Sequence, residues 1–548
     1  MMDLEYPPYG GGSAQSTSNQ QDFDHYYGGS YGGGASISRR EIIEHFADFR
    51  RAIHEGPVSL VQHYYNSNYE TMIQNYNTDW PSAEALKEHV GDDQLFLTLY
   101  KEMYFRHIYA SKPGGVSLEE RQESYMNYID LFNLVLAKDH PLKIELPDQW
   151  LWDIIEEFIY QFQSFCNFRT KLAKRSDDDI EQLKRNMKIW NVHAVLNVMH
   201  SLVDKSRIVE QLEAVKKGVP FHSGGDSFCQ TNLYKMFGYF SLIGLLKLHT
   251  LTSDYYMALK TIECIDLDVT KQNDVCQVFH CIVATNYHAG FCYTMMRNYE
   301  DAIRVFVDTL IYVQRSKPIM VAQTFQNDAV NKTADQMMTL LAICLTLNPM
   351  RIDETIYLHL KEKFIDKLPK PLLSVGADGK LPFRDNFAYA CPKFISPAPT
   401  IFEQRNDSQW AEPFNRQIEV FTEELQEQAY IPDVRSYLKL YTTMSIDKLA
   451  TFMEKTPQEV KPLLLTFKHK LSGTDTANKT EEDFQSSADI DFYVDKNIIY
   501  IADTKITRRY SDYLVKQILK YEELRRRKQH RLTRSLSEGL NIRHAGNK

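Results

Sequence analysis

The stretch DVRSYLKLYTTMSIDKLATFMEKTPQEVKPLLLTFKHKL at residues 433–471, followed by FYVDKNIIYI at 492–501, decides the fold of the C-terminal part of this chain. It holds three short helix patterns and then two β-rich runs that flank a polar turn at 495–497. Three helices and a hairpin in this order, followed by a long helix, are typical of a winged helix. The sequence therefore predicts a winged helix from about residue 433, which would either bind nucleic acid through its third helix or pack against other proteins.

Each of the three helix patterns has a start signal and an apolar face. Asp433, Ser445 and Thr456 are placed to cap the helices, and Thr456 can form a capping box with Glu459. Pro462 lacks a backbone donor, which predicts that the third helix starts late or kinks there. The residues expected to face the core share helical spacing: Val434, Tyr437, Leu438 and Tyr441, then Leu449, Ala450 and Met453, then Val460, Leu463, Leu464, Phe467 and Leu471.

Length and composition limit the class of protein. A chain of 548 residues is too long for one core. Its formal net charge of -9 excludes an overall basic field that would draw the whole molecule to nucleic acid. Eight cysteines without a C-x-x-C pair favour reduced, buried thiols over disulfides or a zinc site. We find neither a secretory signal nor an apolar run long enough for a bilayer, so we expect a cytoplasmic protein without membrane contact.

The apolar pattern divides the rest of the chain into two tails and a long helical region. Residues 1–37 are rich in glycine, serine, glutamine and tyrosine, and we expect this arm to be disordered. From 38 to about 304 the period is helical, with buried helices predicted at 149–166 and 189–203. Residues 529–548 are predicted to form a basic, disordered tail.

A repeat signal lies within this helical region. Gly290, Tyr293, Tyr299, Ala302 and Phe306 fall at the spacing of a tetratricopeptide helix pair, in which small residues let two helices approach. The segment 254–258, DYYMA, echoes NYEDA at 298–302. The fold class predicted is therefore mainly α: a tetratricopeptide-like helical-repeat solenoid, followed by a winged helix and a C-terminal helix.

The motifs of enzymes and cofactor sites are missing. No phosphate-binding G-x-x-x-x-G-K-[ST] loop occurs. His193 and His200 lie on one predicted helix, but without the H-E-x-x-H pattern of zinc proteases. Adjacent carboxylates such as Glu156 and Glu157 point to different helix faces, so they do not form an acid-base pair. We expect no catalytic activity, no metal and no cofactor.

Two kinds of surface residue are candidates for binding. Basic residues outside the apolar stripes suit contact with RNA phosphates rather than base reading: Lys461, Lys468 and Lys470 in the third helix, and Arg525, Arg526 and Arg527 beyond it. The final helix carries an apolar stripe that a lone helix cannot bury, which predicts partner binding: Tyr510, Tyr513, Leu514, Ile518 and Tyr521.

Five short stretches carry a family resemblance: QWLWDII at 149–155, IWNVH at 189–193, CPKF at 391–394, LKLYTTM at 438–444 and ADTK at 502–505. An α-solenoid ending in a winged helix and a trailing helix is the plan of the PCI domain, found in the proteasome lid, the COP9 signalosome and eukaryotic translation initiation factor 3. With these stretches, residues from about 40 to 524 resemble the subunit L family of that initiation factor. The N-terminal arm, the arginine-rich tail and Pro462 depart from the family pattern.

The resemblance implies an organisation and a role. It implies a PCI domain at 305–515, a C-terminal helix ending at 516–528, and a non-catalytic scaffold subunit of initiation factor 3. Such a subunit would help recruit initiator tRNA and mRNA to the 40S ribosomal subunit, next to subunits K and E. A winged-helix regulator that binds nucleic acid is the alternative that the residues leave open.

Overall fold

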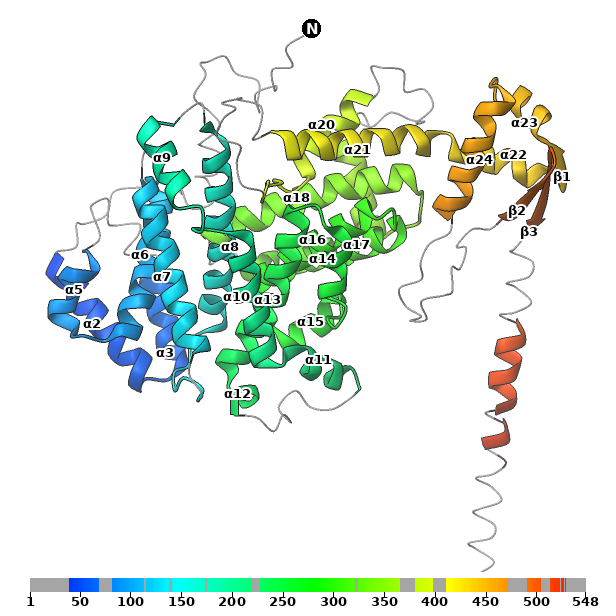
Figure 1. Ribbon diagram of the computed structural model, residues 1–548. Coiled ribbons are helices and arrows are strands. Elements are labelled where there is room, and N and C mark those ends of the chain that lie inside the picture. Colours follow the sequence, from blue (N-terminus) through cyan, green and yellow to red (C-terminus); the bar gives the residue numbers. More distant parts are fainter. Residues whose placement is uncertain are drawn as a thin grey trace, which may run out of the picture. The chain divides into compact units, whose positions relative to one another are not determined.

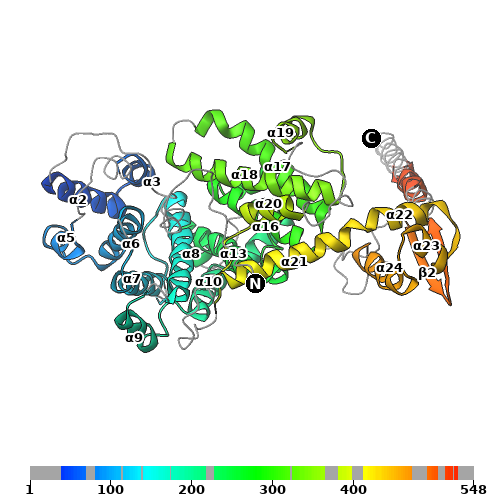
Figure 2. The same cartoon turned by 90° about the horizontal axis from the view of Figure 1, so that it is seen from above.

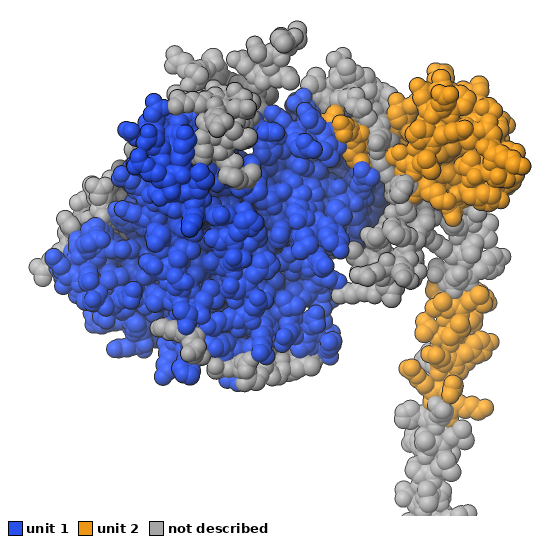
Figure 3. All heavy atoms as spheres, in the orientation of Figure 1, with its two compact units in different colours: residues 1–370, 375–421 blue, residues 371–374, 422–548 orange. Residues whose placement is uncertain are grey.

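The computed structural model describes residues 39–68, 81–112, 115–137, 140–172, 175–217, 227–320, 324–364, 380–397, 411–471, 490–503, 513–522, 524–526 and 528. The chain divides into two compact units, residues 1–370 with 375–421 (unit 1) and residues 371–374 with 422–548 (unit 2), coloured separately in Figure 3. The described residues are mainly helical, so the predicted fold class is confirmed. The arm at 1–37 and the tail at 529–548 lie outside the described residues.

Unit 1 begins with helices that pack against one another, as α6 (Gln94–Ser111) does with α7 (Leu118–Leu136) in Figures 1 and 2. The predicted buried helix at 149–166 lies within α8 (Asp148–Thr170), where Trp150, Ile154 and Phe158 are fully buried. Helix α8 contacts both α7 and α13 (Asn232–Leu251), so its wide apolar surface has partners. The elements in order are α2 (Arg39–Glu55), α3 (Val58–His63), the π-helical turn η1 (Tyr64–Asn68), α5 (Ala83–Val90), α6 (Gln94–Ser111), α7 (Leu118–Leu136), α8 (Asp148–Thr170) and α9 (Asp177–Arg185).

The next predicted helix starts later than its apolar period indicates. Helix α10 (Val192–Ser206) begins after Asn191, whose side chain accepts a hydrogen bond from the His193 N–H at 3.0 Å. Trp190, fully buried, adopts a φ of 50° and donates from its indole N–H to the Arg121 carbonyl at 3.1 Å. The predicted start at residue 189 is therefore wrong, because the cap and the buried tryptophan hold the chain out of the helix. Three helices follow: α11 (Ile208–Lys216), α12 (Ser227–Gln230) and α13 (Asn232–Leu251).

The two similar sequence segments, 254–258 and 298–302, follow turns of the same backbone geometry. The turn between α13 and α14 (Tyr255–Thr261) contains Ser253 at a φ of 65°. The turn between α16 (Phe279–Met295) and α17 (Tyr299–Met320) contains Arg297 at 67°. The next residue of each turn donates its N–H to a carbonyl five residues back at 2.9 Å, Asp254 to His249 and Asn298 to Tyr293. Ala258 and Ala302 are fully buried at matching positions. The two helix pairs therefore share one turn, as a solenoid requires.

The remaining helices of this region continue the packing in sequence order. α16 contacts α17 and α18, and α18 contacts α20. Residues 391–397 follow α20 and return to the core, where the Ile395 N–H donates to the Leu251 carbonyl at 3.1 Å. The helices are α15 (Val269–Val275), α16 (Phe279–Met295), α17 (Tyr299–Met320), α18 (Thr324–Leu347), α19 (Glu354–Phe364), α20 (Lys380–Ala390) and α21 (Glu412–Ala429). Residues 304 and 305 both lie within α17, and the predicted PCI boundary between them stays a prediction.

Gly290 lies where α16 packs against Phe306 of α17. A Cβ on residue 290 would be 2.4 Å from Cε1 of Phe306. We expect Gly290→Ala to destabilise the protein by about 1–3 kcal/mol, because overpacking outweighs the gain in helix propensity of about 1 kcal/mol. Urea unfolding of the variant measures this loss. In a Phe306→Leu background the same substitution should cost little; an equal cost there would contradict close packing against Phe306.

Unit 2 contains a winged helix. Its elements are α22 (Ile431–Leu440), β1 (Thr443–Ser445), α23 (Ile446–Phe452), α24 (Pro457–Leu471), β2 (Ile490–Asp495) and β3 (Ile498–Asp503). The strands form an antiparallel sheet in the order β1-β3-β2, with Met444 opposite Ile499. The predicted apolar faces form its core, in which Val434, Leu449 and Phe467 are fully buried. Ser445 caps α23 by accepting a hydrogen bond from the Lys448 N–H at 3.3 Å, as predicted.

Three details of the winged helix differ from the sequence prediction. α22 begins at Ile431, with Tyr430 at its cap position, so Asp433 lies in the first turn and is not the cap. α24 begins at Pro457 and continues through Pro462, so the helix does not start late. The sheet also has a third strand, β1, which was not expected because three residues are too few to show an alternating pattern.

Candidate interaction surfaces

The C-terminal helix at residues 513–522 presents its apolar side chains to solvent. Four residues of the predicted stripe are between 58% and 69% exposed: Tyr513, Leu514, Ile518 and Tyr521. Val515 and Leu519 lie four residues apart on the same helix and are also more than half exposed, but they were not part of the predicted stripe. Tyr510 lies outside the described residues. The exposed apolar surface is therefore wider than the predicted stripe.

The outward face of α24 combines two lysines with a leucine. Lys461, Leu465 and Lys468 share helical spacing, and Leu465 is 65% exposed. The Lys468 ammonium donates to the Phe492 carbonyl at 2.7 Å and lies 3.5 Å from the Asp491 carboxylate, so it joins α24 to β2. Its charge is therefore already partnered within the fold.

The other residues predicted to contact RNA are only partly described. Lys461, Arg525 and Arg526 are exposed. Arg527 and the side chain of Lys470 lie outside what the structure describes. RNA contact at these positions stays a prediction.

The outer face of the wing carries a pair of tyrosines. Tyr493 on β2 and Tyr500 on β3 lie opposite each other, with ring centres 4.9 Å apart and nearly parallel planes. Tyr493 and Ile498 are both exposed. β2 is an edge strand, so an aromatic and apolar surface lies next to unpaired backbone groups.

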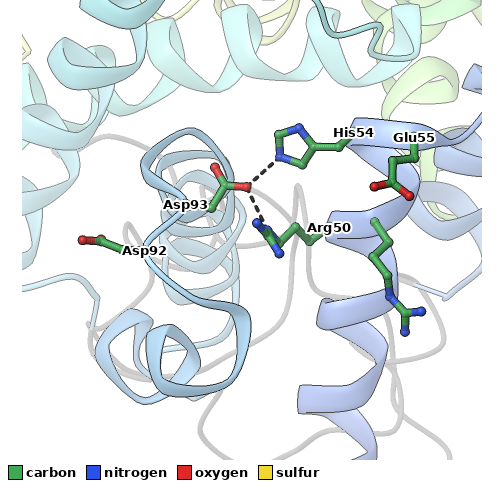
Figure 4. A pocket seen from close by; sticks show the side chains of 6 residues that line it. Arg50, His54, Glu55, Asp92 and Asp93 are labelled. Atoms are coloured by element: carbon green, nitrogen blue, oxygen red, sulfur yellow. Dashed lines mark hydrogen bonds and ion pairs between the residues drawn. The ribbon is translucent and has the colours of Figure 1, made fainter.

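A shallow pocket of about 440 Å³ lies between α2 and the start of α6 (Figure 4). Asp93 accepts hydrogen bonds from Arg50 at 2.9 Å and from His54 at 2.6 Å, and its other oxygen caps α6 at the Phe96 N–H. Burial alone would raise the pKa of Asp93, but these hydrogen bonds lower it below its usual value. The Asp93 carboxylate at the centre of the pocket therefore joins α2 to α6.

A buried polar network lies between α6 and α8. Arg106 pairs with Glu102, donates to the Tyr65 hydroxyl at 2.6 Å and lies 3.6 Å from Asp153. Burial raises the pKa of Asp153 to about 6 and that of Glu157 to about 7, in each case against the opposing charge of Arg106. Glu102, Arg106 and Glu157 are at most 3% exposed, so no substrate reaches them.

A second buried ion-pair group joins α8 to α13 and α16. Glu156 lies 3.4 Å from the Lys247 ammonium and 3.3 Å from His280 Nδ1. Burial would raise the pKa of Glu156, but His280 and Lys247 hold it well below its usual range. Both networks link helices of the solenoid, which is a structural role.

The described residues contain neither a candidate metal site nor a candidate membrane span. Within the ranges given above, no three His, Cys, Asp or Glu side chains gather in a way that could hold a metal ion. No helix in the described part of the chain has the length and apolarity needed to cross a bilayer.

Comparison with known proteins adds the family. A family model described as RNA polymerase I-associated factor PAF67 matches residues 120–521. Eukaryotic translation initiation factor 3 subunit L of Gallus gallus and of Homo sapiens are each 49% identical to this chain over 470 residues, which is 85% of this chain and 82% of theirs. The Danio rerio protein of the same name is 48% identical, over 85% of this chain and 81% of its own.

The chain belongs to the subunit L family of eukaryotic translation initiation factor 3.

This membership confirms the resemblance drawn from five short stretches of sequence. Two of the stretches have clear structural roles in this subunit L family member: Trp190 of IWNVH is fully buried, and the Lys393 carbonyl of CPKF accepts a hydrogen bond from Gln163 at 2.7 Å. The coarse functional prediction, a subunit of translation initiation factor 3, follows from the membership.

Proposed function

We propose that this chain is a non-catalytic scaffold subunit of initiation factor 3, held in the complex by its C-terminal helix and winged helix. The observation that carries the proposal is the exposure of Tyr513, Leu514, Ile518 and Tyr521 on one helix. A surface of this kind on a water-exposed helix is typical of a protein interface. Each such side chain contributes about 1.5–3 kcal/mol when a partner buries it fully.

The wing supports the same proposal. Tyr493, Ile498 and Leu465 are large exposed side chains on a small module, and aromatic residues are enriched at protein interfaces. An exposed leucine in the middle of the third helix fits a protein partner better than a phosphate backbone. The partnered Lys468 likewise weakens the case for nucleic acid binding at this helix.

The wider role follows the family. As a subunit of initiation factor 3 in the cytoplasm, the chain would help bring initiator tRNA and mRNA to the 40S ribosomal subunit, with subunits K and E as neighbours. Lys461, Arg525 and Arg526 would then contact RNA locally, in addition to the contacts that the chain makes with other subunits. The support for this role is the family membership and the sequence similarity over 85% of the chain.

Co-purification tests the proposal. The tagged full chain, expressed in cells and captured in moderate salt, should bring down the other initiation factor 3 subunits in near-equal amounts. Recovery as a lone monomer would contradict a scaffold role. Capture of RNA without other subunits, weakening steeply as salt rises, would instead favour the nucleic-acid-binding alternative.

A further inference from the structure

Two arginine side chains in unit 1 lie close together beside α8. Cζ of Arg121, on α7, is 4.8 Å from the ring centre of Phe168. Cζ of Arg175, in the segment before α9, is 3.6 Å from the same ring centre. The two positive charges are therefore closer than the roughly 10 Å over which 0.1 M salt screens charges. They repel each other in a partly buried place.

The hydrogen bonds of Arg121 leave its charge uncompensated. Arg121 is 6% exposed; its Nε donates to the Val116 carbonyl at 3.2 Å and its Nη1 to the Ser164 hydroxyl at 2.9 Å. Its Cζ also lies 5.3 Å from the ring centre of Tyr109. These partners are all neutral. A buried charge is normally paired with an opposite charge, so this arginine lacks a usual partner.

Two donors at this place lack acceptors. The Nε–H of Arg175 is buried, and among the described residues it has no hydrogen-bond partner. Tyr109 is 7% exposed; its hydroxyl interacts with the Arg121 guanidinium, and no described residue accepts the hydroxyl proton. Burial lowers the pKa of Arg175 and the charge of Arg121 lowers it further, while Asp179 opposes both. An unsatisfied buried donor destabilises the fold, because it has lost its hydrogen bonds to water.

We propose that Arg121, Arg175 and the Tyr109 hydroxyl form a binding site for a single oxyanion, a carboxylate or a phosphate, on a side chain of a partner protein. An oxyanion there would compensate the two charges and accept the protons that lack acceptors. Guanidinium groups suit this task because their planar N–H groups match the oxygens of carboxylate and phosphate. Four segments of the chain supply the site, namely α6, α7, α8 and the segment before α9.

The surroundings favour a protein side chain over a nucleic acid. Asp177, Asp178 and Asp179 form the first turn of α9, directly after Arg175. A strand of RNA carries a phosphate on every nucleotide, so its neighbouring phosphates would meet these carboxylates. A single acidic side chain avoids that repulsion. The oxyanion site and the partner-binding surface at 513–522 use different residues, so an experiment can contradict one of them and leave the other standing.

Titration with inorganic phosphate tests the site on the purified full chain. At constant ionic strength, phosphate replacing chloride should raise the thermal unfolding midpoint of the wild type, because a ligand that binds only the folded state stabilises it. Arg175→Gln should weaken the apparent phosphate affinity at least tenfold. Arg185→Gln is the matched control, since Arg185 is an exposed arginine of α9 that pairs with Glu181 at 3.0 Å; it should keep the response.

The unliganded variants separate a binding role from a structural one. Without phosphate, Arg175→Gln should unfold at the wild-type midpoint or above it, because it removes a repelling charge and an unsatisfied donor. A lower midpoint would make Arg175 a structural residue and overturn the proposal. The proposal is also overturned if neither phosphate nor acetate raises the unfolding midpoint of the wild type. A response to acetate alone would identify a carboxylate as the ligand, and a response to phosphate alone a phosphate.

The class of partner is tested in the assembled complex. A photo-crosslinking residue placed at the exposed position 178, next to the site but not part of it, should capture a protein segment that contains acidic or phosphorylated side chains. A crosslink to RNA in its place would overturn the choice of a protein partner.

Discussion

Replacing Tyr513 and Leu514 together with aspartate is expected to abolish capture of the other initiation factor 3 subunits by the tagged chain. Both side chains are nearly 60% exposed, so the folded chain loses little packing. A partner that buries them would have to bury two unpaired carboxylates, at a cost of several kcal/mol. Since each 1.4 kcal/mol is tenfold in affinity, the expected loss is at least 100-fold. Quantitative co-purification and thermal unfolding of the purified variant measure the two effects.

Helix α19 offers a matched control for this experiment. Tyr357 and Leu358 form an adjacent tyrosine-leucine pair that is 54% and 52% exposed. Tyr357→Asp with Leu358→Asp adds the same charge to the same kind of helix surface, and it should leave co-purification unchanged. Full assembly of the Tyr513 and Leu514 variant, with an unchanged unfolding midpoint, would show that the C-terminal helix does not bind partners.

Arg106→Met is expected to destabilise the protein by about 3–5 kcal/mol at pH 8, because it leaves buried carboxylates without their counter-charge. Glu102 is fully buried, and Asp153 and Glu157 also interact with the lost guanidinium. The loss should shrink as the pH falls. Folding raises the pKa of such a buried acid, so ionising the acid lowers the stability of the folded state. This loss of stability is absent below the unfolded pKa and grows as the pH rises towards and through the folded pKa.

The pH window follows from the wild-type values. The pKa of Asp153 rises from 3.8 to about 6 on folding, and that of Glu157 rises from 4.5 to about 7. Removal of Arg106 raises both further, so the deficit of the variant should be about half as large at pH 5 as at pH 8. Urea unfolding at the two values measures this. Arg185→Met, which removes an exposed pair, should cost less than about 0.5 kcal/mol at either pH; a deficit for Arg106→Met that does not depend on pH would contradict the argument.

The elements that the sequence predicted well are those with long, regular patterns. Helix α8 and the core faces of the winged helix lie where the apolar spacing placed them, because burial of one face is what makes such helices stable. The tetratricopeptide spacing likewise placed Gly290 against Phe306. Short or interrupted elements were predicted poorly. Strand β1 has three residues, and the start of α10 depends on the conformation of Trp190, which distant aromatic rings enclose.

The candidate sites were likewise predicted where they depend on local spacing and missed where they depend on contacts between distant residues. Local spacing predicted the apolar stripe of the C-terminal helix, and the structure adds Val515 and Leu519 to the exposed set. The sequence could not show that Lys468 is held by the Phe492 carbonyl, because that contact joins a helix to a strand 24 residues away. It could not show the arginine site either, since Arg121 and Arg175 meet only when α7 and the end of α8 pack together.

The sequence by itself determined the mainly α fold class, the cap of α23, the apolar faces of α8 and of the winged helix, the missing enzyme motifs and the family. These properties depend on residues within a few turns of one another, and local backbone preference and helical spacing act over that range. Only the tertiary structure decided which charges are paired, which apolar side chains stay exposed, and where two arginines share the ring of Phe168. Burial and charge pairing depend on groups that folding brings together from distant parts of the chain, and no local pattern records them.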